Sequence, residues 1–522
     1  MKPTIALALR ATALAAALAA GAAHAQTSER ESLEVLRQTT LQLIEALVQQ
    51  GVLPADRAKA LIAQAEEKAR AAVAEARKTE QNTVRIQFVP ESVRQQIANE
   101  VREEVVAQAK AERWGDVNAV PEWVDRFRFE GELRLGYQRD MFDEGNAPEF
   151  AFQSSGQNVG NTTVDRDRER LRARLGVTAR VTQDLTAALR LTTGSSDDPV
   201  STNQTLGNYG SKYNFALDRA FLRARSQEFL PWLTTTAGRI PNPFFSTDLV
   251  WDDDLAFDGI ALQYEDPAAN AQVWRPFGTV GWFPIQNIET SLANRARSQS
   301  LLALQGGVEW VPDNKRRAKV GVALYDYSNV SGVRNTAGST TANATQAAYR
   351  QKGNTLFNLS NPTATNGPWG LAKDYRLLNV TGALDYNLWN PVHLILGADY
   401  VKNIGFDRDR SFARTGQNYA SEDTGYQLRV AVGMPTMLLK GDWQLSLAYR
   451  YLEADAVLDA FTDSDFQLGG TNNRGFIVGA QYGLSRNTWL SARWLSGREI
   501  DGSSLNLPLS VNTFQLNFHA RF

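Results

Sequence analysis

Residues 511–522, with the sequence VNTFQLNFHARF, alternate between two kinds of side chain. The apolar side chains share one parity, and they are Phe514, Leu516, Phe518, Ala520 and the terminal Phe522. An alternation with a period of two predicts a β-strand that has one apolar face and one polar face. A single strand of this kind also fits a soluble β-sandwich, so the rest of the chain must decide the fold.

The same alternation begins after Pro121 and is repeated to the end of the chain. In one strand, for example, Leu171, Ala173 and Leu175 alternate with arginines. The pattern predicts sixteen strands, at residues 125–139, 168–182, 184–194, 215–226, 233–239, 258–265, 271–283, 300–311, 317–327, 375–389, 391–403, 424–434, 442–453, 474–485, 487–497 and 511–522.

The connections between these strands alternate in length. The long ones are residues 140–167, 195–214, 240–257, 284–299, 328–374, 404–423, 454–473 and 498–510. The others are mostly short turns, such as Gln183 and Asn390. A transmembrane barrel of the bacterial outer membrane has long external loops and short periplasmic turns. The sequence therefore predicts an all-β barrel of antiparallel strands over residues 121–522, with both of its ends in the periplasm. The terminal Phe522 is typical of such barrels and resembles the signal read by their assembly machinery.

Residues 1–120 have a different organisation. Residues 1–25 are predicted to be a secretory signal peptide, because a basic start and an apolar stretch precede the Ala-x-Ala sequence at 23–25. Residues 26–120 have a helical period, and Leu33, Leu36, Leu43 and Leu47 follow a heptad spacing. These residues predict a small α-helical periplasmic domain. It is either a hairpin packed on itself or a coiled coil that associates subunits.

The composition is compatible with a barrel and excludes several other classes. The mean hydropathy is −0.35, the net charge is −2 and there is no cysteine. After residue 25 no apolar run approaches the roughly 18–20 residues of a membrane helix, but a barrel strand meets lipid with only alternate residues. The absence of cysteine excludes disulfides and thiolate metal sites. A net charge near zero gives no reason to expect nucleic acid as a partner.

Two regions of the sequence resemble the bacterial "putative porin" family of outer-membrane channels. The first region precedes and enters the first strand, with VPESV at 89–93, VPEWVDR at 120–126 and GELR at 131–134. The second contains GRIPNPF at 238–244, DLVWDDD at 248–254 and DG at 258–259. The resemblance extends over essentially the whole mature chain. It implies a porin fold and passive transport, and it fixes no substrate.

Arginines share one parity on the first five predicted strands. If that parity faces the pore, neighbouring strands form one basic wall, which would attract anions. The arginines of this predicted wall are Arg126, Arg128, Arg134, Arg170, Arg172, Arg174, Arg180, Arg190, Arg219, Arg223, Arg225 and Arg239. A barrel lumen is polar in any case, so the alternative is an ordinary lumen without selectivity.

The third long connection is acidic, and it contains Asp248, Asp252, Asp253 and Asp254. In sixteen-strand porins the third loop typically folds inward and narrows the pore. An acidic loop opposite a basic wall would then create a transverse field at a constriction. Two alternatives remain open, namely a solvated external loop and a site for Ca²⁺ or Mg²⁺, because clustered carboxylates bind hard cations. No metal ligand and no cofactor are assigned from the sequence.

The sequence gives little support to an enzyme. After removal of the signal peptide only His393 and His519 could act as imidazole bases, and neither has a serine at a recognisable spacing. We therefore assign no catalytic residue.

The leading hypothesis is a porin through which small hydrophilic solutes diffuse, with a preference for anions. A substrate-selective channel closed by residues 328–374 is a second transport hypothesis. A third hypothesis is a structural anchor, in which the periplasmic helices tether the outer membrane to the cell wall. Deletion of residues 28–113 separates the anchor from the channel, since loss of a tether weakens the envelope without changing conductance. The expected partners are outer-membrane lipid, the solutes and the barrel-assembly machinery. The heptad would suit a homotrimer, which is the usual assembly of sixteen-strand porins.

Overall fold

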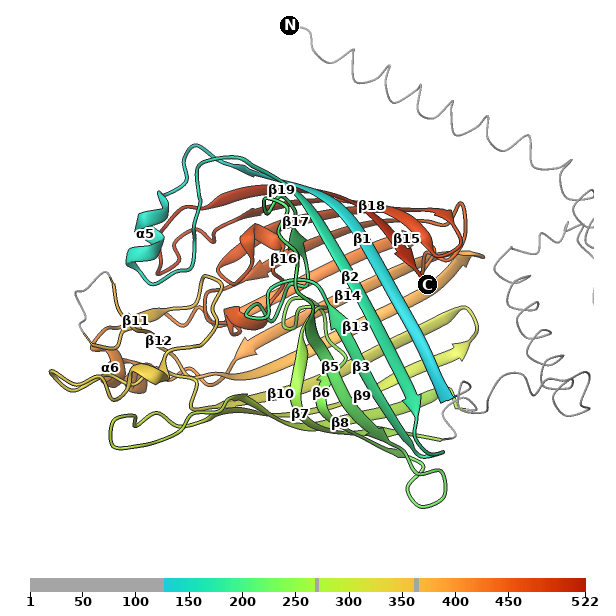
Figure 1. Ribbon diagram of the computed structural model, residues 1–522, viewed down its shortest axis with the longest axis horizontal. Helices are drawn as coiled ribbons and strands as arrows, with labels where there is room; N and C mark the ends of the chain where they lie inside the picture. Colours follow the sequence, from blue (N-terminus) through green and yellow to red (C-terminus); the bar gives the residue numbers. More distant parts are fainter. Residues whose placement is uncertain (1–125, 268–271, 361–365) are drawn as a thin grey trace, which may run out of the picture. The chain divides into compact units, whose positions relative to one another are not determined.

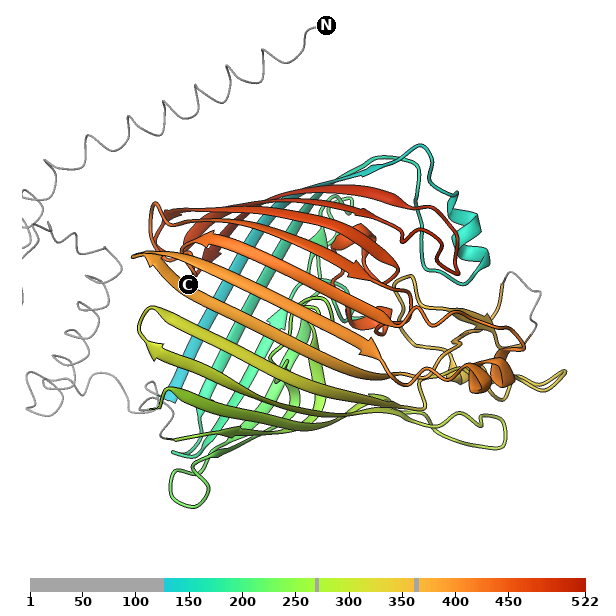
Figure 2. The same cartoon turned by 180° about the vertical axis from the view of Figure 1, so that it is seen from behind.

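The computed structural model describes residues 126–267, 272–360 and 366–522. The predicted signal peptide at 1–25 and the predicted helical domain at 26–120, with its heptad, lie outside the described residues. Loops gather at one end of the barrel and tight turns at the other (Figures 1 and 2).

Sixteen antiparallel strands form a closed barrel, and the sixteen predicted strands are confirmed. Each strand pairs with its neighbour in the chain, and β1 also pairs with β19, so the sheet closes on itself. The strands are β1 (Phe127–Phe142), β2 (Arg166–Arg180), β3 (Leu185–Thr192), β5 (Ala216–Ala224), β6 (Leu233–Pro241), β7 (Ala256–Glu265), β8 (Trp274–Gln286), β9 (Gln299–Asp313), β10 (Arg316–Ser328), β13 (Arg376–Trp389), β14 (Val392–Asn403), β15 (Thr424–Gly433), β16 (Trp443–Leu452), β17 (Asn473–Ser485), β18 (Thr488–Arg498) and β19 (Ser510–Arg521).

Short elements decorate the long connections between these strands. They are β4 (Gln204–Thr205), β11 (Leu356–Asn358), β12 (Trp369–Leu371), α5 (Glu149–Ser154), α6 (Arg408–Thr415), η4 (Asn343–Thr345), η5 (Asp459–Phe461) and η6 (Phe466–Leu468). The two-residue strand β4 lies in the second long connection and pairs with β2 next to the part of β2 that pairs with β3. No helix in the described part of the chain is long and apolar enough to cross a membrane.

The alternation of the sequence separates the two faces of the wall. Leu135 pairs with Phe518 of β19 and Leu171 of β2, and its side chain is exposed on the outside. Arg134, one residue earlier, pairs with His519 and Arg172 on the inner face. Apolar side chains on the outer face contact lipid, so their exposure costs no free energy of hydration. Polar side chains on the inner face contact the water of the lumen.

The largest apolar core lies inside one end of the barrel and not between two sheets. It joins the inner faces of β7 to β10 to residues of the third, fifth and seventh long connections, among them Trp251, Leu371 and Leu458. We call these connections loop 3 (residues 242–255), loop 5 (residues 329–375) and loop 7 (residues 453–472). Part of each of these three loops is therefore packed into the barrel interior.

Candidate pore constriction

Loop 3 is held inside the barrel by aromatic packing. Its first turn is fixed by Asn242, whose Oδ1 accepts a hydrogen bond of 2.9 Å from the backbone N–H of Phe244. The ring of Phe244 lies edge-on to Tyr325 of β10, with 5.2 Å between the ring centroids. Trp251, further along the loop, is 2% exposed and also lies edge-on to Tyr325, at 5.1 Å. Edge-to-face pairs of this kind add about 0.5–1.5 kcal/mol each beyond the burial of apolar area.

Polar contacts connect loop 3 to strands on several sides of the barrel wall. The hydroxyl of Thr247 donates to Asp399 of β14 at 2.6 Å. Asp248 forms an ion pair of 2.9 Å with Arg450 of β16. Asp254, near the end of the loop, pairs with Arg174 of β2. Since β2 lies nearly opposite β14 in the strand order, the loop spans the lumen.

Asp254 joins loop 3 to the arginines of β2. It accepts hydrogen bonds from the backbone N–H of Thr202 at 3.0 Å and from the Thr202 hydroxyl at 2.8 Å. It is also paired with Arg174 and lies 3.4 Å from Arg172. Burial raises the pKa of this carboxyl, but Arg174, Arg172 and Arg134 together lower that pKa below its ordinary value. Asp254 is therefore ionised at neutral pH.

The pKa of Asp252 is shifted in the opposite direction to that of Asp254. Its side chain accepts hydrogen bonds from the backbone N–H groups of Asp254 at 2.7 Å and Ser464 at 3.0 Å. Burial raises the pKa of Asp252 well above its ordinary value, and the nearby Asp254 and Asp463 raise this pKa further. The acidic cluster therefore carries less negative charge than its sequence suggests.

Asp253 projects into the lumen, and its side chain has no hydrogen bond or ion pair with any residue that the structure describes. The side chain remains accessible to solvent. Enclosure by the protein raises its pKa, and Asp248, Asp254 and Asp463 raise it further, to about 6. Asp253 is thus the member of the cluster whose charge changes near physiological pH.

We expect the ion selectivity of the channel to change with pH near this value. As the pH falls through about 6, Asp253 takes up a proton and the lumen loses one negative charge, so preference for anions should rise. Reversal potentials measured in a salt gradient between pH 7.5 and pH 5 provide the test. Asp253→Asn should show the acidic-pH selectivity already at pH 7.5, whereas Asp143→Asn in an exposed external turn should behave like the wild type. A midpoint near 6 that persists in Asp253→Asn would contradict this assignment.

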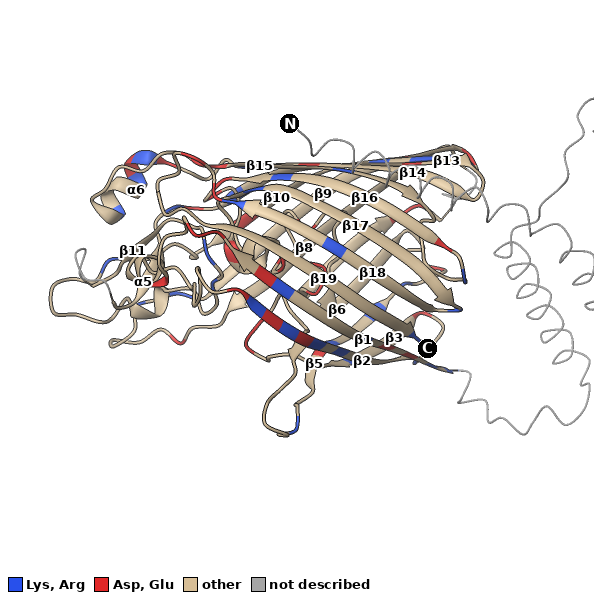
Figure 3. Ribbon diagram, turned by 90° about the horizontal axis from the view of Figure 1, so that it is seen from above, with Lys and Arg blue, Asp and Glu red and all other residues tan. Residues whose placement is uncertain are grey.

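On β1 and β2, where the basic wall was predicted, basic and acidic positions follow one another (Figure 3). Most of its central members have acidic or amide partners. Arg172 pairs with Glu132, Arg134 with Asn203, and Arg170 lies 3.8 Å from Asp465 of loop 7. On β3, Arg190 donates to Asp218 at 2.6 Å. The charge of this part of the wall is therefore largely compensated.

Other members of the predicted wall have no acidic partner in the described part of the chain. Among the described residues, no carboxylate lies within 4.0 Å of the guanidinium groups of Arg126, Arg128, Arg180, Arg219 and Arg223. Arg219 faces Arg190 directly in the strand pairing, and its Nε has no hydrogen-bond partner among the described residues. Arg225 lies just beyond the end of β5 and pairs with Glu265 at 2.8 Å.

Arg239 does not join the wall in the way the alternation predicts. On β6 the buried, inward side chains are Thr234, Thr236 and Ile240, which have the opposite parity. Arg239 instead pairs with Asp258 of β7 at 3.1 Å. Arg239 is therefore engaged by Asp258 and stands apart from the arginines of β1 and β2.

The sequence analysis missed the charges that loop 7 brings to the constriction. Asp463 pairs with Arg450 of β16 at 2.9 Å, and Asp465 pairs with Arg493 of β18 at 3.0 Å. Arg450 is only 1% exposed, so it is a buried cation held between loops 3 and 7. The inward parity of Arg450 and Arg493 is visible in the sequence, but their acidic partners are distant in the chain and no local pattern identifies them.

The two histidines and the loop carboxylates are the side chains from which a metal or catalytic site could be built. Within the described ranges, no group of three or more His, Asp or Glu residues is placed to hold a metal ion. His519 stacks on Trp489 with 4.6 Å between the ring centroids, and its Nε2 lies 2.9 Å from the hydroxyl of Ser491. His393 of β14 has a carboxylate partner, because its Nδ1 is hydrogen-bonded to Asp385 of β13.

A closed barrel of sixteen strands, apolar outside and charged inside, is the architecture of transmembrane channels of the porin class. The chain belongs to the family described as "Putative porin", whose model matches residues 37–522. Fold and family together make it an outer-membrane porin.

Comparison with solved structures returns other bacterial channels at low sequence identity. OprB of Pseudomonas putida is 12% identical with a TM-score of 0.46, and the match covers 78% of this chain and 98% of that one. The outer-membrane channel DcaP of Acinetobacter baumannii is 13% identical with a TM-score of 0.40, over 76% and 97% of the chains. The anion-selective porin from Comamonas acidovorans is 13% identical with a TM-score of 0.39, over 76% and 99%. No curated protein matches the sequence.

Proposed function

We propose that this porin allows passive diffusion of small hydrophilic solutes through a charge-lined constriction, with a preference for anions. The observation that carries the proposal is the position of loop 3, whose Asp254 meets Arg172 and Arg174 inside the closed barrel. Side by side, fixed charges of both signs order water and favour polar solutes over apolar ones.

The preference for anions is supported by the arginines that lack an acidic partner. Arg128 and Arg180 lie toward the short-turn end of β1 and β2, and Arg219 and Arg223 lie on β5. Of the loop carboxylates, Asp248 and Asp254 are engaged by arginines and Asp252 carries a raised pKa. Asp253 contributes one negative charge above about pH 6, against four arginines without an acidic partner among the described residues. The excess charge that remains in the lumen is positive, which raises the local concentration of anions.

Single-channel recording in a planar bilayer tests the proposal. Purified full-length protein should give stable open steps, and a salt gradient should give a reversal potential of the sign expected for an anion-preferring channel. A folded barrel that never conducts would exclude diffusion through it. A cation-preferring channel would exclude the proposed role of the arginines.

Replacement of Arg219 and Arg223 by glutamine should weaken the anion preference. A unit charge about 8 Å from a permeating ion in water contributes roughly 0.5 kcal/mol, which is favourable for an anion and unfavourable for a cation. Each change should therefore lower the anion-to-cation permeability ratio about fivefold. Arg172 and Arg174 are unsuitable for this test, because their loss leaves Asp254 without its partners. As a control for the loss of a hydrogen-bonding side chain without a change of charge, Gln481→Leu on β17 should leave the ratio unchanged.

We propose in addition that the short turns and both ends of the barrel face the periplasm, and that the chain assembles as a homotrimer. Barrel closure by the outer-membrane assembly machinery is proposed from the terminal Phe522. The anchor hypothesis remains the alternative for the residues that precede the barrel.

A further inference from the structure

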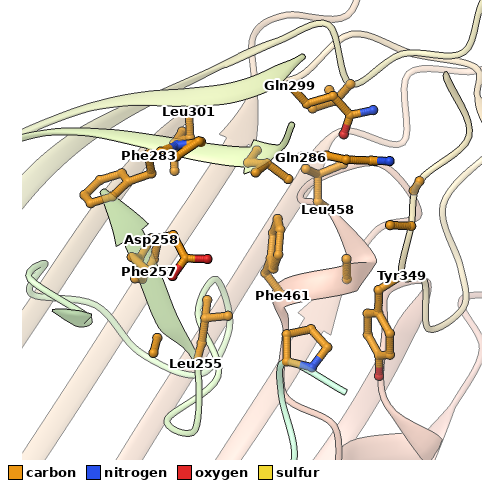
Figure 4. Close-up of a pocket in the computed structure, with 18 of the residues that line it drawn as sticks. Leu255, Phe257, Asp258, Phe283, Gln286, Gln299, Leu301, Tyr349, Leu458 and Phe461 are labelled. Carbon is orange, nitrogen blue, oxygen red and sulfur yellow. The ribbon is translucent and has the colours of Figure 1, made fainter. Parts of the chain in front are cut away.

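A second feature of the barrel interior is a cavity of about 290 Å³ at the loop end, beside loop 3. Phe257 and Phe283, from the inner faces of β7 and β8, contribute to one side of it, and Leu458 and Phe461 of loop 7 contribute to the other (Figure 4). Ser196, Asp197 and Ala348 also line the cavity and are exposed, so the cavity is open to water. It lies apart from the arginines of β1 and β2, none of which lines it.

The walls of this cavity are suited to an apolar ring. Besides the two phenylalanines of the wall and Phe461, they contain Leu255 and Leu301. An apolar cavity of roughly 150 Å³ accepts a molecule of the size of benzene. A cavity of about 290 Å³ therefore has room for one ring and a small substituent.

Two glutamines supply hydrogen-bonding groups at one side of the cavity. Gln286 and Gln299 are partners in the pairing of β8 with β9, and both amides lie on the same side of the cavity (Figure 4). Gln299 is 4% exposed, and its Nε2 has no acceptor among the described residues. The Oε1 of Gln286 is buried and has no donor among them. A buried amide without partners costs free energy, and a ligand that offers one donor and one acceptor removes that cost.

The charges around the cavity disfavour an anion. Asp197, Asp258 and Asp459 line it, while the one cationic residue of the lining is Arg239, which is engaged by Asp258. A carboxylate ligand would therefore meet a net negative surrounding. The cavity therefore disfavours anions, whereas the arginine-lined part of the lumen attracts them.

We propose that this cavity is a binding site for an uncharged solute made of one aromatic ring and a group that both donates and accepts hydrogen bonds. The ring lies between Phe283 and Phe461, the donor of Gln299 meets the acceptor of the solute, and the acceptor of Gln286 meets its donor. The site holds such a solute beside loop 3, at the loop end of the barrel.

Benzamide is a suitable probe, because it has one ring and an uncharged amide. Isothermal titration calorimetry of the full-length protein in detergent should show saturable binding of one benzamide per chain. Benzoate should bind at least tenfold more weakly because of its charge, and acetamide should give no binding because it lacks the ring. The measurement does not depend on conduction, so it can succeed or fail independently of the proposed diffusion of hydrophilic solutes.

Variants identify the site. The double change Gln286→Leu and Gln299→Leu should weaken benzamide binding at least tenfold, and Ala347→Trp in loop 5 should block binding by filling the cavity. Gln481→Leu, on the inner face of β17 outside the cavity lining, should bind benzamide like the wild type. Migration of each variant as a folded, heat-modifiable barrel confirms that it is intact. Unsaturable uptake into the detergent, equal binding of benzoate, or binding that survives both changes would overturn the proposal.

Discussion

Arg450→Leu is expected to release loops 3 and 7 together and to raise single-channel conductance. The guanidinium of Arg450 pairs with Asp248 of loop 3 and Asp463 of loop 7, each at 2.9 Å, and it is almost fully buried. Removing one partner of a buried ion pair costs about 3–5 kcal/mol, because the remaining charge is left without compensation. Here one substitution leaves two carboxylates, those of Asp248 and Asp463, without a compensating charge. A loss of 3 kcal/mol corresponds to a factor of about 150 in the ratio of packed to released loops.

Limited proteolysis and conductance measure this release. In Arg450→Leu, cleavage within residues 453–472 should become fast, and the open steps should become larger and noisier. Arg429→Leu is a matched control, since Arg429 also lies on an inner face and has no carboxylate within 4.0 Å among the described residues. Equal conductance and equal resistance to protease in Arg450→Leu and the wild type would show that this ion-pair cluster does not hold the loops.

Trp251→Ala should free loop 3 alone. Trp251 packs edge-on to Phe257 at 4.9 Å and to Tyr325 at 5.1 Å, and it is 2% exposed. Replacing a buried tryptophan by alanine typically costs about 3–5 kcal/mol, since the apolar contacts are lost and a cavity remains. Because the polar contacts of Asp248 and Asp254 cannot offset that loss, loop 3 should leave the lumen for part of the time.

Single-channel conductance again measures this change and should rise. Liposome-swelling assays should show that larger sugars pass through the barrel. Trp282→Ala is the control, because Trp282 is half-exposed on the outer face of β8 and does not contact loop 3. The variant should enlarge the pore without making residues 453–472 sensitive to protease, which distinguishes it from Arg450→Leu. An unchanged size limit for sugars in Trp251→Ala would mean that loop 3 does not set the width of the channel.

Local pattern determined the barrel in this sequence. The strand β13 was expected at 375–389 and is Arg376–Trp389, and β14 was expected at 391–403 and is Val392–Asn403. Such agreement is possible because each strand lies between lipid and water, so the two environments impose a period of two on residues that are neighbours in the chain. The same local rule did not identify the partner of Arg239, which is Asp258 of the neighbouring strand.

The constriction, the cavity and the balance of charge were decided only by the tertiary structure. Asp254 meets an arginine 80 positions earlier in the chain, and Gln427 binds Asp248 across 179 positions. Ion pairs and hydrogen bonds over such distances leave no periodic signal, because their partners are chosen by how the loops fold into the lumen. The sequence thus determined the wall of the channel, through the alternation that lipid and water require. The packing of the loops determined which of its charges remain free.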